Sequence, residues 1–268
     1  MLNQTQNLSS ECFQNQEAPN RRLLEEKLMQ RDSLEVKQLV TTLRSFFSGE
    51  GVFRDLGLEQ LPERYVWPKK GEFPSFGTNS FEGTNYQKNI QLKDQFAGLW
   101  ADNDHLTIAQ WIIRDWGGIR TNRESTIANY VRSIEAGSYP SQLGGVASYS
   151  KILAFIEPDK YAIYDARVAA SLNGIQLLQN VTDGVIWNNL PGRNSTIEKF
   201  KASLGGSTAL RRRGWTRMKK ADCYSAYNSV LGQALSFFPD YRLFHLEMSL
   251  FANAEVIVDR CLNSRATS

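Results

Sequence analysis

Apolar residues recur at helical spacing along most of the chain, which predicts a mostly α fold. Capping residues precede many of these stretches, and glycine or proline follows them. The predicted helices cover residues 21–31, 34–47, 90–116 with a break at Asn103 or Asp104, 122–136, the stretch between Gly145 and Pro158, a helix from Ala166 onward, 198–204, 221–238 and 241–262. Strand signals are few, and the apolar residues 185–187 fit a short helix or a buried strand.

Two stretches lack this periodicity. Residues 1–20 are rich in Asn, Gln and Ser, so we expect a disordered polar terminus followed by one helical domain over residues 21–268. Residues 50–88 combine Gly, Pro and aromatic side chains, which predicts a long loop that its aromatics hold on the surface. Asn173-Gly174 and Asp183-Gly184 are expected to be turns.

Composition narrows the classes of protein that fit. The chain has 268 residues, a net charge of +3 and a pI near 8.7, which permits nucleic-acid binding without requiring it. Cys12, Cys223 and Cys261 are scattered, so we expect free thiols, no metal and no cofactor. His105 and His245 are the two histidines, which argues against a Ser-His-Asp hydrolase. Without an apolar leader or membrane span, we expect a cytoplasmic monomer.

One segment, residues 143–172, carries the candidate chemistry. Gly144 and Gly145 predict a tight turn, and an apolar helix follows it. Pro158 ends that helix, because proline lacks the N–H that a helix interior needs. A short extended piece then leads to Asp165, which is placed to cap the next helix at its N-terminus.

This order of elements resembles the helix-hairpin-helix DNA glycosylase superfamily, and within it the 8-oxoguanine glycosylases. The matching pieces are residues 143–146 for the hairpin and 163–168 for the aspartate segment, within about thirty residues. The resemblance implies two helical subdomains around a cleft. Residues 89–172 would form the hairpin-bearing core, and residues 21–88 and 173–268 would form the second subdomain.

The sequence departs from the family at one position. Many members carry a lysine just after the hairpin that attacks the sugar, but the commonest spacing falls here on Ala147 or Ser148. Lys151 is the nearest lysine, about one helical turn further on. Two chemistries therefore stay open. Either Lys151 replaces the family lysine, or the enzyme uses water as its nucleophile and has no lyase activity. We expect the second.

The resemblance assigns roles to residues of this segment. Asp165 would stabilise the positive charge that develops on the sugar, or orient the attacking water. Backbone N–H groups at the turn would hold a DNA phosphate, with hydroxyl and guanidinium groups nearby. The predicted DNA contacts in this segment are Gly144, Gly145, Ala147, Ser148, Ser150 and Arg167, and the predicted base-pocket residues are Tyr149 and Tyr164.

A second candidate contact is the basic run over residues 211–220. It contains Arg211, Arg212 and Arg213, followed by Trp215. Arginines beside a tryptophan suit phosphate contacts combined with base stacking. A solvated linker between helices explains the same run equally well.

Three functions therefore compete. The first is a glycosylase that excises a damaged or modified base flipped from double-stranded DNA, in repair or antiphage defence. The second is a non-catalytic helix-hairpin-helix DNA-binding protein. The third is a helical interaction protein, in which Asp165 is a plain cap and Gly144-Gly145 an ordinary turn.

Overall fold

The computed structural model describes residues 36–68, 72–76, 80–138, 143–204 and 207–266. The predicted polar terminus, the predicted helix 21–31 and Cys12 lie outside these ranges. The chain divides into two units, residues 1–38 and residues 39–268. Of the first unit, the structure describes only residues 36–38, which are helical.

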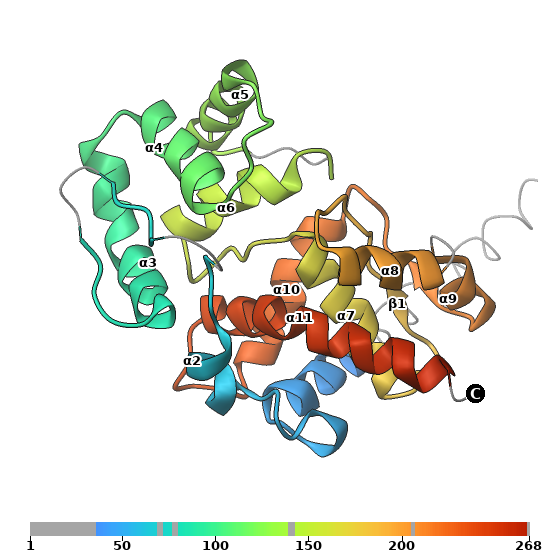
Figure 1. Ribbon diagram of the computed structural model, residues 1–268. Coiled ribbons are helices and arrows are strands. Elements are labelled where there is room, and N and C mark those ends of the chain that lie inside the picture. The colour runs from blue at the N-terminus through green and yellow to red at the C-terminus, as the bar shows by residue number, and fades with distance from the viewer. Residues whose placement is uncertain (1–35, 69–71, 77–79, 139–142, 205–206, 267–268) are drawn as a thin grey trace, which may run out of the picture. The chain divides into compact units, whose positions relative to one another are not determined.

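The second unit is mostly helical, as the apolar periodicity predicts (Figure 1). Its first helix ends at residue 47. The three single-turn elements are η1 (Gly51–Phe53), η2 (Leu58–Gln60) and the π-helix η3 (Ile112–Trp116). The α-helices are α2 (Leu61–Arg64), α3 (Asn85–Asp102), α4 (His105–Trp111), α5 (Glu124–Glu135), α6 (Val146–Ile156), α7 (Ala166–Leu178), α8 (Ser195–Ser203), α9 (Thr208–Arg212), α10 (Cys223–Leu235) and α11 (Leu243–Ala266).

Local capping explains where several helices begin. Thr84 forms a capping box with Gln87 at the start of α3. The predicted break at Asn103 or Asp104 falls at Asp104, whose carboxylate accepts a hydrogen bond of 2.8 Å from Thr107 N. Asn194 caps α8 in the same way. Each cap satisfies an N–H group that has no partner within its own helix.

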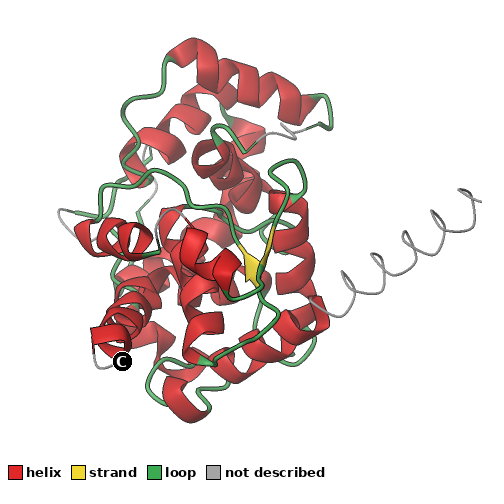
Figure 2. Cartoon of the chain, turned by 90° about the vertical axis from the view of Figure 1, so that its right-hand side faces the viewer, coloured by secondary structure: helices red, strands yellow, loops and turns green. Residues whose placement is uncertain are grey.

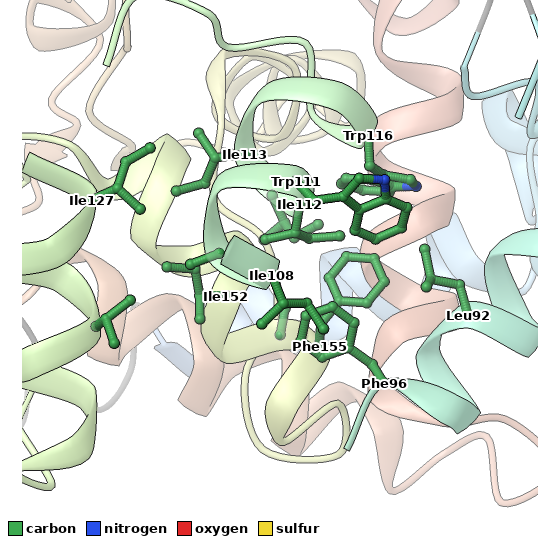
Figure 3. Close-up of a cluster of buried hydrophobic side chains, with 14 of the residues drawn as sticks. Leu92, Phe96, Ile108, Trp111, Ile112, Ile113, Trp116, Ile127, Ile152 and Phe155 are labelled. Carbon is green, nitrogen blue, oxygen red and sulfur yellow. The ribbon is translucent and has the colours of Figure 1, made fainter. Parts of the chain in front are cut away.

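The first buried cluster joins α3, α4, η3, α5 and α6 (Figure 3). Phe155 of α6 lies at its centre, with ring centroids 4.8 Å from Trp116 and 5.1 Å from Phe96. Such aromatic pairs contribute about 0.5–1.5 kcal/mol each beyond the area that they bury. Nearly every residue of α6 is buried, so this packing fixes the helix that follows the glycine turn.

The second buried cluster is built on α7 and α11, which lie side by side in Figure 1. Gly174 of α7 permits this approach, because a Cβ atom there would lie 2.5 Å from Ile257 Cγ2 of α11. Helix α8, strand β1 and the side chain of Trp215 also contribute to this cluster. The helix that begins at Asp165 is thereby held along its length by the last helix of the chain.

The predicted turn at Asn173-Gly174 is wrong, because both residues lie inside α7. The Asn173 amide donates to Trp187 O at 3.0 Å and accepts from Trp187 N at 2.9 Å. These two bonds and the close contact of Gly174 with α11 stabilise a helix that local preference disfavours. Tertiary contacts therefore carry α7 on to Leu178.

Of the two structures predicted for residues 185–187, a short helix or a buried strand, the strand is confirmed at residues 185 and 186. β1 (Val185–Ile186) pairs in parallel with β2 (Thr216–Arg217), and Figure 2 shows this small sheet among the helices. The basic run is therefore not a loop throughout: Arg211 and Arg212 lie on α9, and part of the run is β2. Trp215 is buried with 3% of its surface exposed, so the prediction that it stacks on a base is wrong.

The aromatic stretch 50–88 holds η1, η2 and α2 and is less irregular than its sequence indicates. Several of its rings pack against the first cluster: Trp67, Phe73, Phe76 and Phe81. Trp67 Nε1 donates to Trp116 O at 3.1 Å, and Trp111 Nε1 reaches back to Ser75 O at 2.8 Å. The aromatics of this region hold the segment to the helices, as expected.

Candidate functional site

The glycine turn is exposed at the start of α6. Gly145 has φ +78°, a left-handed conformation that glycine adopts without strain, and it is the N-cap of α6. A Cβ atom on Gly145 would also lie 2.0 Å from the Tyr130 hydroxyl, so only glycine fits here. At Gly144 the same construction meets nothing within 4 Å. The turn thus presents exposed backbone beside a helix N-terminus. Some of its N–H groups are already used: Val146 N donates to Leu143 O at 3.2 Å, and Ser148 N donates to Gly145 O at 2.8 Å.

Asp165 is the N-cap of α7, as predicted. Its Oδ1 accepts hydrogen bonds from Arg167 N at 2.9 Å and Val168 N at 3.0 Å. The residue is only half-buried, and neither of these two bonds uses Oδ2. The carboxylate is therefore held in one orientation by two backbone N–H groups.

Lys151 lies in the middle of α6 with 5% of its surface exposed. Its Nζ donates to Ala147 O of the preceding turn at 2.5 Å. The aliphatic part packs on Gly117, where a Cβ atom would lie 2.8 Å from the lysine Cδ and Cε. Burial lowers the pKa of Lys151, and the negative charges of Asp165 and Glu247 oppose that shift.

A buried ion pair adds two charges that the sequence reasoning missed. Lys93 Nζ of α3 lies 3.6 Å from Glu247 Oε2 of α11, with side-chain exposures of 0% and 3%. Lys93 Nζ also lies 4.3 Å from the ring centroid of Phe155. Burial raises the pKa of Glu247 to about 7, and the positive charge of Lys93 opposes the rise. Charged residues inside the apolar stripes of two predicted helices were the available signal.

The charges of this region act on one another. The negative charge of Asp165 raises the pKa of Glu247 and opposes the burial effect at Lys151. Asp165 and Glu247 also add to the raised pKa of Tyr65, for which burial is the largest cause. Helices α3, α6, α7 and α11 therefore bring two carboxylates and two lysines into one electrostatically linked group, defined here as Lys93, Lys151, Asp165 and Glu247.

The two tyrosines predicted for the base pocket are buried in protein. Tyr149 is 1% exposed, and Tyr164 has no exposed surface. The Tyr164 hydroxyl donates to Asn188 O at 2.9 Å, and its ring packs against Tyr227 with centroids 5.2 Å apart. In this arrangement protein side chains cover the ring faces that a base would need, so neither ring is open to an extruded base.

The predicted hydroxyl and guanidinium contacts are also engaged within the protein. Ser148 Oγ accepts from Asn122 Nδ2 at 2.6 Å, and Ser150 Oγ accepts from Tyr164 N at 3.2 Å. Both serines are buried. Arg167 pairs with Glu255 of α11 at 2.6 Å. These side chains support the segment, whereas the backbone of the glycine turn is its exposed part.

The remaining predicted contacts lie elsewhere on the surface. Arg211, Arg212 and Arg213 are exposed at the end of α9. His245 is engaged within the protein: its Nδ1 accepts from Arg242 N at 3.0 Å, and burial lowers its pKa to about 4. Cys223 and Cys261 are buried, and neither forms a disulfide among the described residues.

Comparisons with known proteins assign no family to this chain: no family model, curated protein or solved structure matches it significantly.

Within the described ranges, no three His, Cys, Asp or Glu side chains gather to hold a metal ion. None of the described helices combines the length and apolar character needed to cross a membrane. The candidate site thus rests on its own geometry.

Proposed function

We propose that this protein is a DNA glycosylase of the helix-hairpin-helix type, with two helical subdomains around a cleft. It hydrolyses the N-glycosidic bond of a damaged or modified base flipped from double-stranded DNA, in repair or antiphage defence, without lyase activity. One observation carries the proposal: an exposed glycine turn and a half-buried capping carboxylate stand at the two helix starts of one continuous segment, Gly145 and Asp165.

Each helix start supplies one part of the reaction. The turn before α6 offers backbone N–H groups to a phosphate, which positions the strand without reading its sequence. The carboxylate before α7 faces the positive charge that develops on deoxyribose as the base departs. Because Asp165 Oδ1 is occupied by two backbone N–H groups, the side chain meets this charge without reorganisation.

Water is the proposed nucleophile. The Lys151 amine is buried and bonded to a carbonyl of its own helix, and Gly117 confines its stem. To attack a sugar, the amine would have to leave both contacts. The supported product is an abasic site in an uncut strand, and borohydride should trap no covalent adduct.

The alternative is a helix-hairpin-helix protein that binds DNA without cleaving a bond. The burial of Tyr149 and Tyr164 favours it, because neither ring is open to an extruded base. It keeps the turn for phosphate contact and makes Asp165 a structural cap only. The two proposals differ in whether the charge of Asp165 is needed for a reaction.

The test is Asp165→Asn assayed on DNA carrying oxidised, alkylated, deaminated or phage-type hypermodified bases, with alkali-labile sites as the readout. Asparagine is as good an N-cap as aspartate, so the fold should hold. We expect excision to fall about a hundredfold or more while DNA binding persists. Asp104→Asn changes a second capping aspartate outside the site and should keep full activity. Wild-type protein that binds DNA but cleaves none of the substrates supports the alternative, and salt-insensitive or absent binding would exclude both.

A further inference from the structure

The loop that joins η3 to α5, residues 117–123, lies against the start of α6. Asn122 Nδ2 donates to Ser148 Oγ at 2.6 Å, in the first turn of that helix. Gly117 packs against the stem of Lys151 one turn further on. These contacts hold the 117–123 loop beside the exposed glycine turn.

The same loop also reaches the side of the molecule that carries Asp165. Gly118 O accepts a hydrogen bond of 2.6 Å from Arg193 Nη2. The residue before Arg193 is Gly192, where a Cβ atom would lie 3.0 Å from the Cβ of Ala166. Ala166 follows Asp165 directly, so the loop extends from the glycine turn toward the candidate carboxylate.

Two arginines of this region have exposed side chains that are not engaged within the protein. Neither Arg120 nor Arg123 forms an ion pair or a side-chain hydrogen bond with any residue that the structure describes, the nearby Asp115 and Glu124 included. Arg123 is the N-cap residue of α5 but makes no side-chain cap bond, and the helix dipole opposes a cation at that end. The fold therefore does not need these two charges, which stay open to a ligand.

Tyr130 continues this surface to the glycine turn. It lies seven residues after Arg123, two turns along the same face of α5, which packs against α6 (Figure 1). A Cβ atom on Gly145 would lie 2.0 Å from the Tyr130 hydroxyl, so this hydroxyl stands directly at the turn. The ring is held by Tyr149 of α6, with centroids 5.8 Å apart.

The Tyr130 hydroxyl is available as a hydrogen-bond donor. Tyr130 is half-buried, and its hydroxyl keeps accessible surface and bonds to no other group in the described ranges. Burial raises the pKa of Tyr130 above its ordinary value, so the hydroxyl keeps its proton at neutral pH. It can donate to an anion that lies on the exposed backbone of Gly144 and Gly145.

We propose that Arg120, Arg123 and Tyr130, together called the arginine–tyrosine surface, bind the phosphodiester backbone of the DNA strand that crosses the glycine turn. Two guanidinium groups and a hydroxyl donor suit phosphate oxygens. The two helical turns between Arg123 and Tyr130 rise about 10 Å, which exceeds the size of one phosphate and fits a ligand that carries a row of them. The inference rests on the proposed function only in taking DNA as the ligand.

Tyr130→Phe tests the hydroxyl, with binding to a fluorescent DNA duplex measured by anisotropy at several salt concentrations. The variant should bind roughly tenfold more weakly, because one hydrogen bond to a charged group is lost. Its salt slope should equal that of the wild type, since no charge is removed. The control, Tyr86→Phe, changes another half-buried tyrosine, which packs on His245, and should bind like the wild type. Equal affinities of the two variants would exclude Tyr130 from the surface.

Arg120→Ala/Arg123→Ala tests the charges in the same assay. It should weaken binding roughly tenfold or more and lower the salt slope by about two. Arg120→Lys/Arg123→Lys keeps both charges and should keep the slope. Arg54→Ala/Lys199→Ala removes the same charge from exposed residues elsewhere and should also keep it. Equal losses in the two alanine variants would overturn the proposal.

A competitor distinguishes a phosphate backbone from another polyanion. Polyglutamate at the same concentration of charge should displace the labelled duplex from the wild type at least tenfold less effectively than unlabelled duplex does. Equal displacement would show that the surface binds acidic polypeptides as readily as DNA, and would overturn the phosphate assignment.

The two proposals can fail independently. If no substrate is excised but the surface variants lose affinity as stated, the arginine–tyrosine surface stands without the glycosylase. If bases are excised and these variants bind like the wild type, the glycosylase stands and the strand contacts proposed here are wrong. Wild-type protein that binds no duplex would overturn both.

Discussion

Neutralising the buried carboxylate of Glu247 should stabilise the protein at neutral pH. Glu247→Gln keeps the size of the side chain and imitates its protonated form. Burial raises the pKa of Glu247 to about 7 from an ordinary value of 4.5, even though Lys93 Nζ lies only 3.6 Å away. Neither Lys93 Nζ nor Glu247 Oε2 has a hydrogen bond among the described residues, so the pair compensates its own desolvation poorly.

The magnitude follows from proton linkage. A rise in pKa from 4.5 to about 7 corresponds to about 3 kcal/mol, at about 1.4 kcal/mol for each tenfold change in proton affinity. The folded protein holds the Glu247 proton more tightly than the unfolded chain does. This contribution to stability is therefore fully present below pH 4.5 and is lost as pH rises to about 7.

Urea unfolding of wild type and Glu247→Gln at a series of pH values measures this difference directly. The two proteins should be equally stable below about pH 4, and the variant should be more stable by up to about 3 kcal/mol above pH 7. Glu59→Gln changes an exposed glutamate of η2 and should stay within about 0.5 kcal/mol at every pH. Parallel pH curves for wild type and Glu247→Gln, or a less stable variant at neutral pH, would refute the reasoning.

Four further substitutions test the segment around the site. Gly145→Ala should cost about 1–3 kcal/mol in urea unfolding, because it combines a positive φ with a clash at the Tyr130 hydroxyl. Gly144→Ala meets open space and should cost less than about 0.5 kcal/mol, so equal losses would contradict this account. Lys151→Met should leave base excision within about threefold of wild type, and a borohydride-trapped adduct that it abolishes would establish an amine nucleophile. Asn173→Ala removes two buried backbone contacts and should lower stability by about 2–4 kcal/mol, whereas an unchanged Tm would show that α7 needs neither.

Local chemistry made the elements of the candidate segment predictable. The Gly144-Gly145 turn, the break at Pro158 and the cap at Asp165 depend on residues within one or two turns of each other. The same holds for Asp104 at the start of α4. Such features depend on the backbone preference of one residue or on a hydrogen bond from a side chain to the next turn. They are therefore independent of the rest of the chain.

Side-chain environments could not be predicted in this way. Tyr149 and Tyr164 are aromatic residues of the kind that line a base pocket, and the sequence places them beside the turn and the aspartate. In the structure, helices from other parts of the chain bury them. Trp215 lies in a basic run and is nevertheless buried against α7 and the residues that follow it. Burial depends on partners distant in sequence, and periodicity within one element does not identify them.

The sequence by itself determined a mostly helical chain, the turn at Gly145 and the position of Asp165 at a helix start, because each follows from backbone preferences that act over a few residues. Only the tertiary structure decided that Lys93 meets Glu247 and that Arg193 reaches Gly118. Both features join segments far apart in the chain, and the free energy of burial arises only after those segments have packed together.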